Sequence, residues 1–198
     1  MSNTTGDFII YTLLIIGAYI VGSIPFADII GKLKRINFKE VGSKNPGAAN
    51  VTHNLGFKYG LLVGILDISK AMIPIFIINN YFVVPVWFLV IFSITFILGH
   101  NYSIFLNFNG GKGVSTAMGV VLALTPISYI IGFAILMIFT MKKQVAPGML
   151  IFFTLVPILN KYLYCNATYT LISCLVLSVL IFRRITCTNN YSIKAIFN

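Results

Sequence analysis

Long apolar stretches separated by short polar segments are the feature that most constrains this chain. Several of them approach the roughly 20 residues that a helix needs to cross a bilayer. Only 9% of the residues are charged, against about a quarter in soluble domains, so the apolar surface needs lipid to cover it. We therefore expect an all-α, polytopic membrane helical bundle. Its apolar segments are residues 8–32, 55–78, 82–99, 114–125, 126–141, 145–160 and 168–182.

The number of membrane crossings depends on the fourth stretch. We expect seven crossings, with five or six as the alternative, because residues 114–125 form a short segment that can be tilted or half-inserted between its neighbours. The N-terminal segment lacks the basic residues of a cleavable signal, so the first stretch is expected to remain as a span. The length of 198 residues is that of one domain, residues 1–198.

The placement of basic residues predicts the orientation. With seven spans and the N-terminus outside, twelve lysines and arginines face the cytoplasm, Lys161 alone lies outside, and Lys70 lies within the second span. The C-terminus and the polar loops are then cytoplasmic. The net charge of +10 reflects this topology and anionic headgroups, so nucleic acid is not an expected partner. The cytoplasmic set is Lys32, Lys34, Arg35, Lys39, Lys44, Lys58, Lys112, Lys142, Lys143, Arg183, Arg184 and Lys194.

Two of the four acidic residues fall inside predicted spans. Asp28 precedes Lys32 by four residues and Asp67 precedes Lys70 by three, spacings that place opposite charges on one helix face. A bare carboxylate is expensive in a bilayer. Two interpretations stay open: local ion pairing near the helix ends, or a proton or ion relay.

Metal and disulfide chemistry are not expected. Cys165, Cys174 and Cys187 occur singly, without a CxxC motif or a histidine cluster nearby. The sequence therefore predicts no disulfide framework and no metal site.

The first cytoplasmic loop, residues 39–56, alternates small residues and side-chain amides with glycines. Glycine lets backbone N–H groups approach a ligand closely, and Ser43, Asn45 and Asn50 can donate hydrogen bonds to oxyanions. These residues suit a phosphate. An ordinary turn-rich connection uses the same residue types and is the alternative.

The second cytoplasmic loop places Gly110, Gly111, Lys112 and Gly113 directly before the fourth apolar stretch. Unpaired N–H groups and the positive end of a helix dipole attract an anion there, and Lys112 adds a full charge. The loop is not a Walker A motif, because Leu106 stands at its first glycine and Gly113 at its Ser or Thr. Glycines used for helix packing are the alternative.

Classical nucleophilic and acid–base machinery is absent from the sequence. His100 is a candidate general base, a phosphate donor or a structural residue. No Ser-His-Asp order, paired carboxylates or H-x4-D pattern occurs, since Lys58 follows His53 by five positions and Phe105 follows His100 by five. Any chemistry must therefore depend on holding phosphate and a reactive substrate together.

Four segments follow one another along the chain: residues 22–26 (GSIPF), 42–50 (GSKNPGAAN), 99–100 (GH) and 110–116 (GGKGVST). Together they resemble the bacterial integral-membrane glycerol-3-phosphate acyltransferases that use acyl phosphate. The resemblance implies a seven-helix enzyme of the bacterial cytoplasmic (inner) membrane, with its active site on the cytoplasmic side. It would make lysophosphatidic acid from acyl phosphate and glycerol 3-phosphate, the first acylation of phospholipid synthesis. No cofactor and no obligate protein partner are implied, and membrane lipid surrounds the enzyme.

The same resemblance assigns site residues. The catalytic candidates are Lys112, Ser43 and His100. The candidates for substrate or phosphate binding are Asn45, Gly47, Asn50, His53, Gly110, Gly111, Gly113, Ser115 and Thr116.

Departures from the family pattern gather at these contacts. The family favours Thr where Ala49 stands and Arg where His53 stands. Its third loop has a serine where residues 142–148, including Val145, have none, and its C-terminal loop has His-Arg, Asn and a later Glu where residues 182–186 keep only positive charge. The alternatives are therefore a phosphate or ion transporter built on Asp28 and Asp67, or a degenerate, non-catalytic relative.

Overall fold

The computed structural model describes residues 5–188, which form helices joined by loops and contain no strand. Five helical segments are long and apolar enough to cross a membrane: Thr5–Leu33, Phe57–Tyr81, Val86–Leu106, Val145–Leu163 and Ala167–Cys187. Two further apolar helices, Val114–Leu124 and Pro126–Met141, are shorter. The expected all-α, multi-pass membrane fold is confirmed, and the seven-span count stays a prediction.

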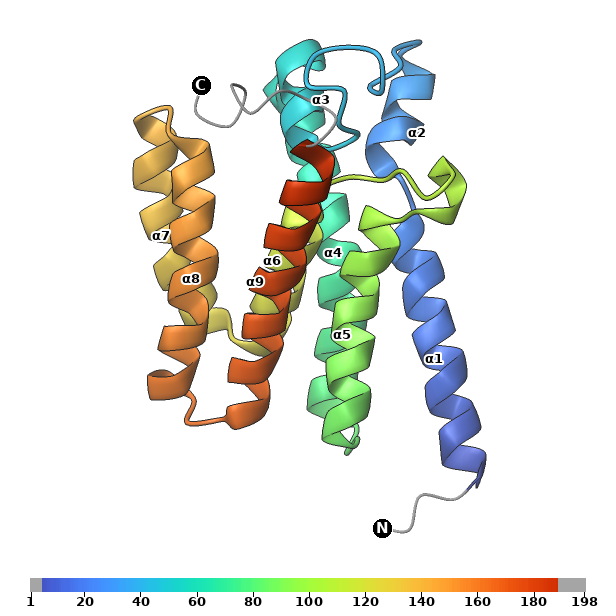
Figure 1. Cartoon of the computed structure of the whole chain (residues 1–198), viewed down its shortest axis with the longest axis vertical. Coiled ribbons are helices and arrows are strands. Elements are labelled where there is room, and N and C mark those ends of the chain that lie inside the picture. The colour runs from blue at the N-terminus through green and yellow to red at the C-terminus, as the bar shows by residue number, and fades with distance from the viewer. Residues whose placement is uncertain (1–4, 189–198) are drawn as a thin grey trace. The chain divides into compact units, whose positions relative to one another are not determined.

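The chain divides into two compact units, Met1–Gly119 and Val120–Asn198. In the first unit α1 packs against α5, and the short α3 packs against α4 (Figure 1). Its elements are α1 (Thr5–Ser23), α2 (Phe26–Leu33), α3 (Ala48–Leu55), α4 (Phe57–Tyr81), α5 (Val86–Asn101), the 3-10 turn η1 (Ile104–Leu106) and the start of α6 (Val114–Leu124).

Small residues bring α1 and α5 together. A Cβ on Gly22 would overlap the Phe96 carbonyl, and one on Gly99 would overlap the Tyr19 carbonyl. Such close backbone approach is how membrane helices gain packing contacts without a hydrophobic driving force. Where α1 ends, a hydrogen bond also ties the two segments together, because the Ser103 hydroxyl, just after α5, donates to the Ser23 carbonyl.

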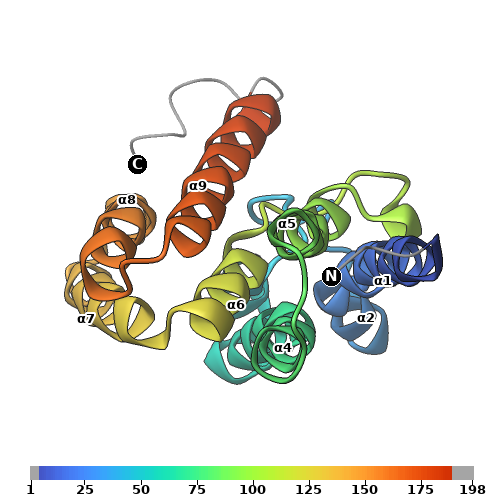
Figure 2. The ribbon, with the colours of Figure 1, turned by 90° about the horizontal axis from the view of Figure 1, so that it is seen from below.

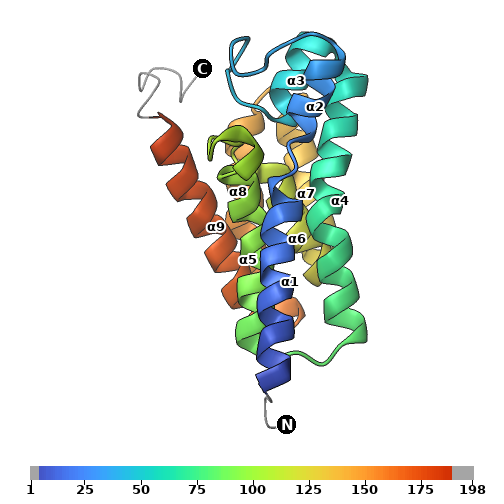
Figure 3. The ribbon, with the colours of Figure 1, turned by 90° about the vertical axis from the view of Figure 1, so that its right-hand side faces the viewer.

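The first apolar stretch, expected as one span, is broken at Ile24 and Pro25. The helix α1 ends at Ser23, and α2 starts at Phe26 after a non-helical link (Figure 3). A residue before proline is disfavoured in the helical region, which explains the break. Asp28 therefore lies in the short α2, where it pairs with Lys32 at 3.1 Å.

The first loop and α3 rest on a small apolar core. Phe38 from the loop and Val51 from α3 are almost fully buried against Val63 of α4 and Ala27 and Ile30 of α2. The first loop is therefore packed against α2 and α4 through this core.

The second unit holds the end of α6, α7 (Pro126–Met141), α8 (Val145–Leu163) and α9 (Ala167–Thr188). Consecutive helices pack side by side, α7 on α8 and α8 on α9 (Figure 2). The sequence boundary between the fourth and fifth stretches is confirmed, because α6 ends at Leu124 and Pro126 opens α7, where a missing N–H costs nothing. Polar contacts join α8 to α9, because Asn160 Nδ2 donates to Ser173 Oγ at 3.3 Å and to the Tyr169 carbonyl at 3.4 Å.

Candidate functional site

A single side chain, Asn50, organises the first loop. Its Nδ2 donates to the carbonyls of Phe38 and Val41, both at 3.1 Å, and its Oδ1 accepts from the Ser43 N–H at 3.1 Å. The Asn54 amide also donates to this oxygen, at 3.0 Å. Asn50 is buried, so the structure gives its amide to the loop's own backbone.

The other predicted residues of this loop surround the start of α3. Ser43 is exposed and Asn45 half-buried, and Gly47 is the N-cap of α3. The sequence reading treated residues 39–56 as loop throughout, whereas residues 48–55 form this helix. Ser43 and Asn45 therefore come just before the N-terminal end of α3, and a helix N-terminus suits an anion.

His53 lies on the last turn of α3 and is exposed. Ala49 is exposed one turn earlier on the same helix. Both positions that depart from the family pattern thus lie on the helix that follows Ser43 and Asn45 in the chain.

The glycine loop, residues 102–113 between α5 and α6, is held mainly by backbone hydrogen bonds. The Gly110 N–H donates to the Asn101 carbonyl and the Gly111 N–H to the His100 carbonyl, each at 3.1 Å. Gly113 has a φ of +79°, a conformation that favours glycine, and leads into α6. Lys112, between two buried glycines, is exposed. The loop therefore presents Lys112 beside the N-terminal end of a helix.

Ser115 and Thr116 differ in accessibility. Ser115 is half-buried in the first turn of α6, close in sequence to Lys112. Thr116 is fully buried, and its hydroxyl has no hydrogen-bond partner among the described residues.

Behind the glycine loop lies a buried polar cluster formed by Asp67 and Lys70 of α4 and His100 of α5. The predicted Asp67–Lys70 ion pair is confirmed, with a distance of 2.6 Å between Oδ1 and Nζ. Lys70 Nζ also lies 3.0 Å from His100 Nδ1 and donates to the Ile24 carbonyl at 3.1 Å. The part that His100 plays in this cluster was not visible in the sequence, because its partners lie on another helix.

Sequence reasoning also missed Asn101, the residue after His100. It is fully buried, neither polar atom of its side chain has a partner among the described residues, and a Cβ on Gly113 would overlap its Oδ1. A polar residue closing an apolar stretch beside a glycine loop is the signal that could have identified it. Asn101 is thus an unsatisfied amide directly beneath the loop.

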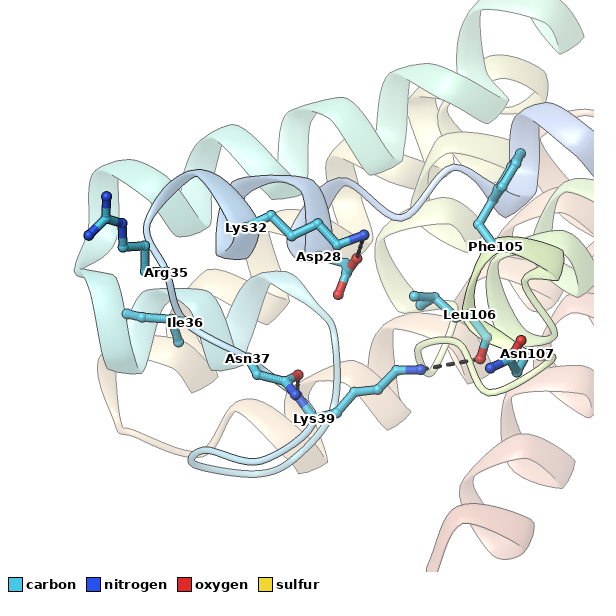
Figure 4. Close-up of a pocket in the computed structure, with 9 residues that line it drawn as sticks. All are labelled: Asp28, Lys32, Arg35, Ile36, Asn37, Lys39, Phe105, Leu106 and Asn107. Atoms are coloured by element: carbon cyan, nitrogen blue, oxygen red, sulfur yellow. Dashed lines mark hydrogen bonds and ion pairs between the residues drawn. The ribbon is translucent and has the colours of Figure 1, made fainter.

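A pocket of about 500 Å³ opens between α2 and η1 (Figure 4). Lys39 reaches across it and donates to the Leu106 carbonyl at 3.2 Å, so the first loop is tied to the glycine loop. None of the predicted site residues lines this pocket. Its lining is Asp28, Lys32, Arg35, Ile36, Asn37, Lys39, Phe105, Leu106 and Asn107.

Comparison with known proteins identifies the family. The model of the glycerol-3-phosphate acyltransferase family matches residues 12–195. The chain belongs to this family. The resemblance seen in its loops is therefore confirmed.

Known glycerol-3-phosphate acyltransferases resemble this chain in both sequence and fold. The glycerol-3-phosphate acyltransferase of Aquifex aeolicus is 46% identical over 134 residues, which cover 67% of this chain and 70% of the relative. The crystal structure of PlsY (YgiH), an integral membrane glycerol 3-phosphate acyltransferase, in its glycerol 3-phosphate form matches with a TM-score of 0.82 and 34% identity over 90% of both chains. Its lysophosphatidic acid form matches with a TM-score of 0.80, at the same identity and coverage.

The remaining departures from the acyltransferase pattern lie in the second unit. Lys142, Lys143 and Val145 are exposed around the start of α8. Near the end of α9, Arg183 is buried while Phe182 is exposed. The C-terminal residues where the family has an acid lie outside the described residues, and the sequence contains no acid there.

Proposed function

We propose that this protein is a membrane enzyme that transfers an acyl group from acyl phosphate to glycerol 3-phosphate, giving lysophosphatidic acid and phosphate. The observation that carries the proposal is the match, over 90% of both chains, to a crystal structure of an acyltransferase in its glycerol 3-phosphate form. The family match over residues 12–195 supports it across the same region. The whole chain, residues 1–198, then acts as a single acyltransferase domain.

The chemistry needs no covalent nucleophile on the protein. Acyl phosphate is a mixed anhydride and is already activated. The glycerol hydroxyl oxygen attacks the acyl carbon, the new ester bond forms, and the bond from that carbon to the phosphate oxygen breaks. Phosphate leaves with the bonding electrons, and one of its oxygens accepts the hydroxyl proton. The protein has to hold both substrates and neutralise the departing charge.

The two loops supply groups for these tasks. Lys112 and the N–H group of Gly113 neutralise a phosphate, with Ser115 and Thr116 beside them. The N–H groups of Gly110 and Gly111 donate to the Asn101 and His100 carbonyls, so these two glycines shape the loop that holds the phosphate. Ser43, Asn45, Gly47 and His53 contact phosphate or glycerol from the first loop and α3. The buried amide of Asn50 holds the backbone of that loop. His100 contacts the glycine loop through its ring and its carbonyl. These assignments rest on the motif positions, the exposure of Ser43 and Lys112 and the bonds of Asn50.

The reaction is placed at the cytoplasmic face of the bacterial inner membrane. Seven crossings with the N-terminus outside and the C-terminus inside put twelve basic residues in the cytoplasm and Lys161 alone on the other side. One of the twelve, Lys194, lies outside the described residues. Acyl phosphate, glycerol 3-phosphate and membrane lipid are the partners in this proposal, with no cofactor, metal or obligate protein partner.

The test is acyl transfer to labelled glycerol 3-phosphate in detergent or in membranes, with acyl phosphate or acyl-CoA as donor. Product is expected from acyl phosphate alone. Lys112→Ala should lower turnover by about 100- to 1,000-fold, the usual cost of removing a group that stabilises developing charge. Because Lys112 is exposed, the variant should stay folded.

Lys161→Ala is the matched control, since it removes a lysine from the opposite face and should leave turnover unchanged. Product from acyl-CoA alone would overturn the proposed donor. A folded protein that gives no product from either donor would overturn the enzyme assignment, and full turnover by Lys112→Ala would overturn the phosphate-loop assignment.

A further inference from the structure

The buried cluster of Asp67, Lys70 and His100 contacts the glycine loop through His100. All three residues are less than 10% exposed. An ammonium group has three donors, and three acceptors surround Lys70 Nζ: Asp67 Oδ1 at 2.6 Å, His100 Nδ1 at 3.0 Å and the Ile24 carbonyl at 3.1 Å. Acceptance from the lysine assigns the ring proton of His100 to Nε2, and His100 Nδ1 also lies 3.5 Å from Asp67 Oδ1.

The far side of the same ring meets the glycine loop. A Cβ on Gly111 would overlap His100 Nε2, so only a residue without a side chain lets the loop lie against the ring. The His100 carbonyl also accepts the Gly111 N–H at 3.1 Å. Gly111 immediately precedes Lys112. His100 is therefore in contact with Lys70 on one side and with the loop that carries Lys112 on the other.

The cost of this arrangement argues for a function. Burying an acid, a lysine and a histidine among apolar helices costs desolvation free energy. Well-packed apolar side chains at the same positions are often at least as stabilising. An ion relay needs a series of such groups, but the sequence has only four acidic residues. Asp28 pairs with Lys32 in α2, and neither of these two is part of the cluster.

We propose that Asp67, Lys70 and His100 form a positioning unit that fixes residues 110–113 so that Lys112 meets the substrate phosphate. Lys70 holds the His100 ring at Nδ1, Asp67 balances the lysine charge, and the ring and carbonyl of His100 hold Gly111. The contact with the Ile24 carbonyl anchors the unit to the junction of α1 and α2. The inference rests on the proposed function for what Lys112 does, but not for how its loop is held.

The first experiment replaces both charges at once. Asp67→Leu with Lys70→Met removes the ion pair without leaving one charge unpaired, so the helices should still fold. The KM for one of the two phosphate substrates should rise and kcat/KM should fall by about 100-fold, because small displacements of a substrate-holding group cost that much. Ser93→Ala is the matched control in α5, since it is also buried and its hydroxyl has no partner among the described residues.

A second readout does not depend on turnover. Amide hydrogen exchange of the peptide containing residues 110–113 should accelerate by about tenfold in the double variant. The hydrogen bonds that fix the loop should break more often once the positioning unit is lost. A peptide from α8 should keep its exchange rate. If the wild-type protein shows no acyl transfer, the proposed function fails, and this exchange measurement still decides on the positioning unit.

Two substitutions of His100 separate the ring's role from general packing. His100→Asn keeps a side-chain acceptor near the position of Nδ1 and should restore much of kcat/KM, whereas His100→Leu should match the double variant. An unchanged KM together with unchanged exchange of residues 110–113 in the double variant would overturn the proposal. Equal losses in His100→Asn and His100→Leu would also overturn it.

Discussion

The first loop and the glycine loop present groups suited to a phosphate, but they are built in opposite ways. In the first loop one side chain, Asn50, supplies the bonds that hold the backbone around Ser43. In the glycine loop the bonds run from backbone to backbone, and the absence of side chains at Gly110 and Gly111 lets the loop lie on His100. The first loop should therefore lose its conformation when the Asn50 side chain is truncated. The glycine loop should lose its conformation when a side chain is added at one of these glycines.

Among the changes that test how the two loops are built, the largest effect is expected from adding one methyl group to the glycine loop. In Gly111→Ala the new Cβ would overlap the His100 ring, which lies in a buried cluster and cannot move aside. The loop and Lys112 should shift, and kcat/KM should fall by about 100-fold. Steady-state acyl transfer with purified variant protein measures this.

The matched control for that substitution is Gly17→Ala in α1, where a new Cβ meets no other atom within 4 Å. Its turnover should equal that of the wild type. Wild-type kinetics in Gly111→Ala would show that the loop does not depend on its close approach to His100.

A smaller effect is expected from removing the amide that organises the first loop. Asn50→Ala leaves the carbonyls of Phe38 and Val41 and the Ser43 N–H without their side-chain partner, at a cost of about 1–3 kcal/mol. The loop should open locally while the helices persist. Trypsin cleavage after Lys39 and Lys44, followed in detergent, should become faster.

Asn50→Asp tests which half of the amide matters. It keeps an acceptor for Ser43 and Asn54 but loses both donors, so its cleavage rate should lie between those of wild type and Asn50→Ala. Asn54→Ala, which removes a single donor to Asn50 Oδ1, is the milder control. Cleavage of all these variants at the wild-type rate would mean that Asn50 does not hold the loop.

Local spacing explains why some features were predictable from the sequence. The Asp67–Lys70 and Asp28–Lys32 pairs follow from positions on one helix, and both are present. The end of α6 and start of α7 follow from Pro126. Such features depend only on neighbours along the chain, which a sequence displays directly.

Contacts between elements explain what was missed. The same amide that could donate to a phosphate can donate to a backbone carbonyl, so the direction of the Asn50 side chain was open until Phe38 and Val41 were placed. His100 meets Lys70 across 30 positions of sequence, a pairing that no local pattern encodes.

The smallest effect is expected at His53, outside both bonding networks just compared. This residue is exposed on the last turn of α3, where the family pattern has arginine. A guanidinium stays charged and can bind phosphate with two parallel donors, whereas a histidine carries little charge above neutral pH. His53→Arg should lower the KM for a phosphate substrate about three- to tenfold, a change of about 1 kcal/mol typical of an exposed charged contact, and leave thermal stability unchanged.

Kinetics at pH 8 with glycerol 3-phosphate and acyl phosphate varied in turn would show which substrate gains. His53→Gln, which has no charge, is the control and should leave both KM values near those of the wild type. If His53→Arg also changes neither value, this end of α3 does not reach a substrate phosphate, and the anion contacts of the first loop are confined to the region of Ser43 and Asn45.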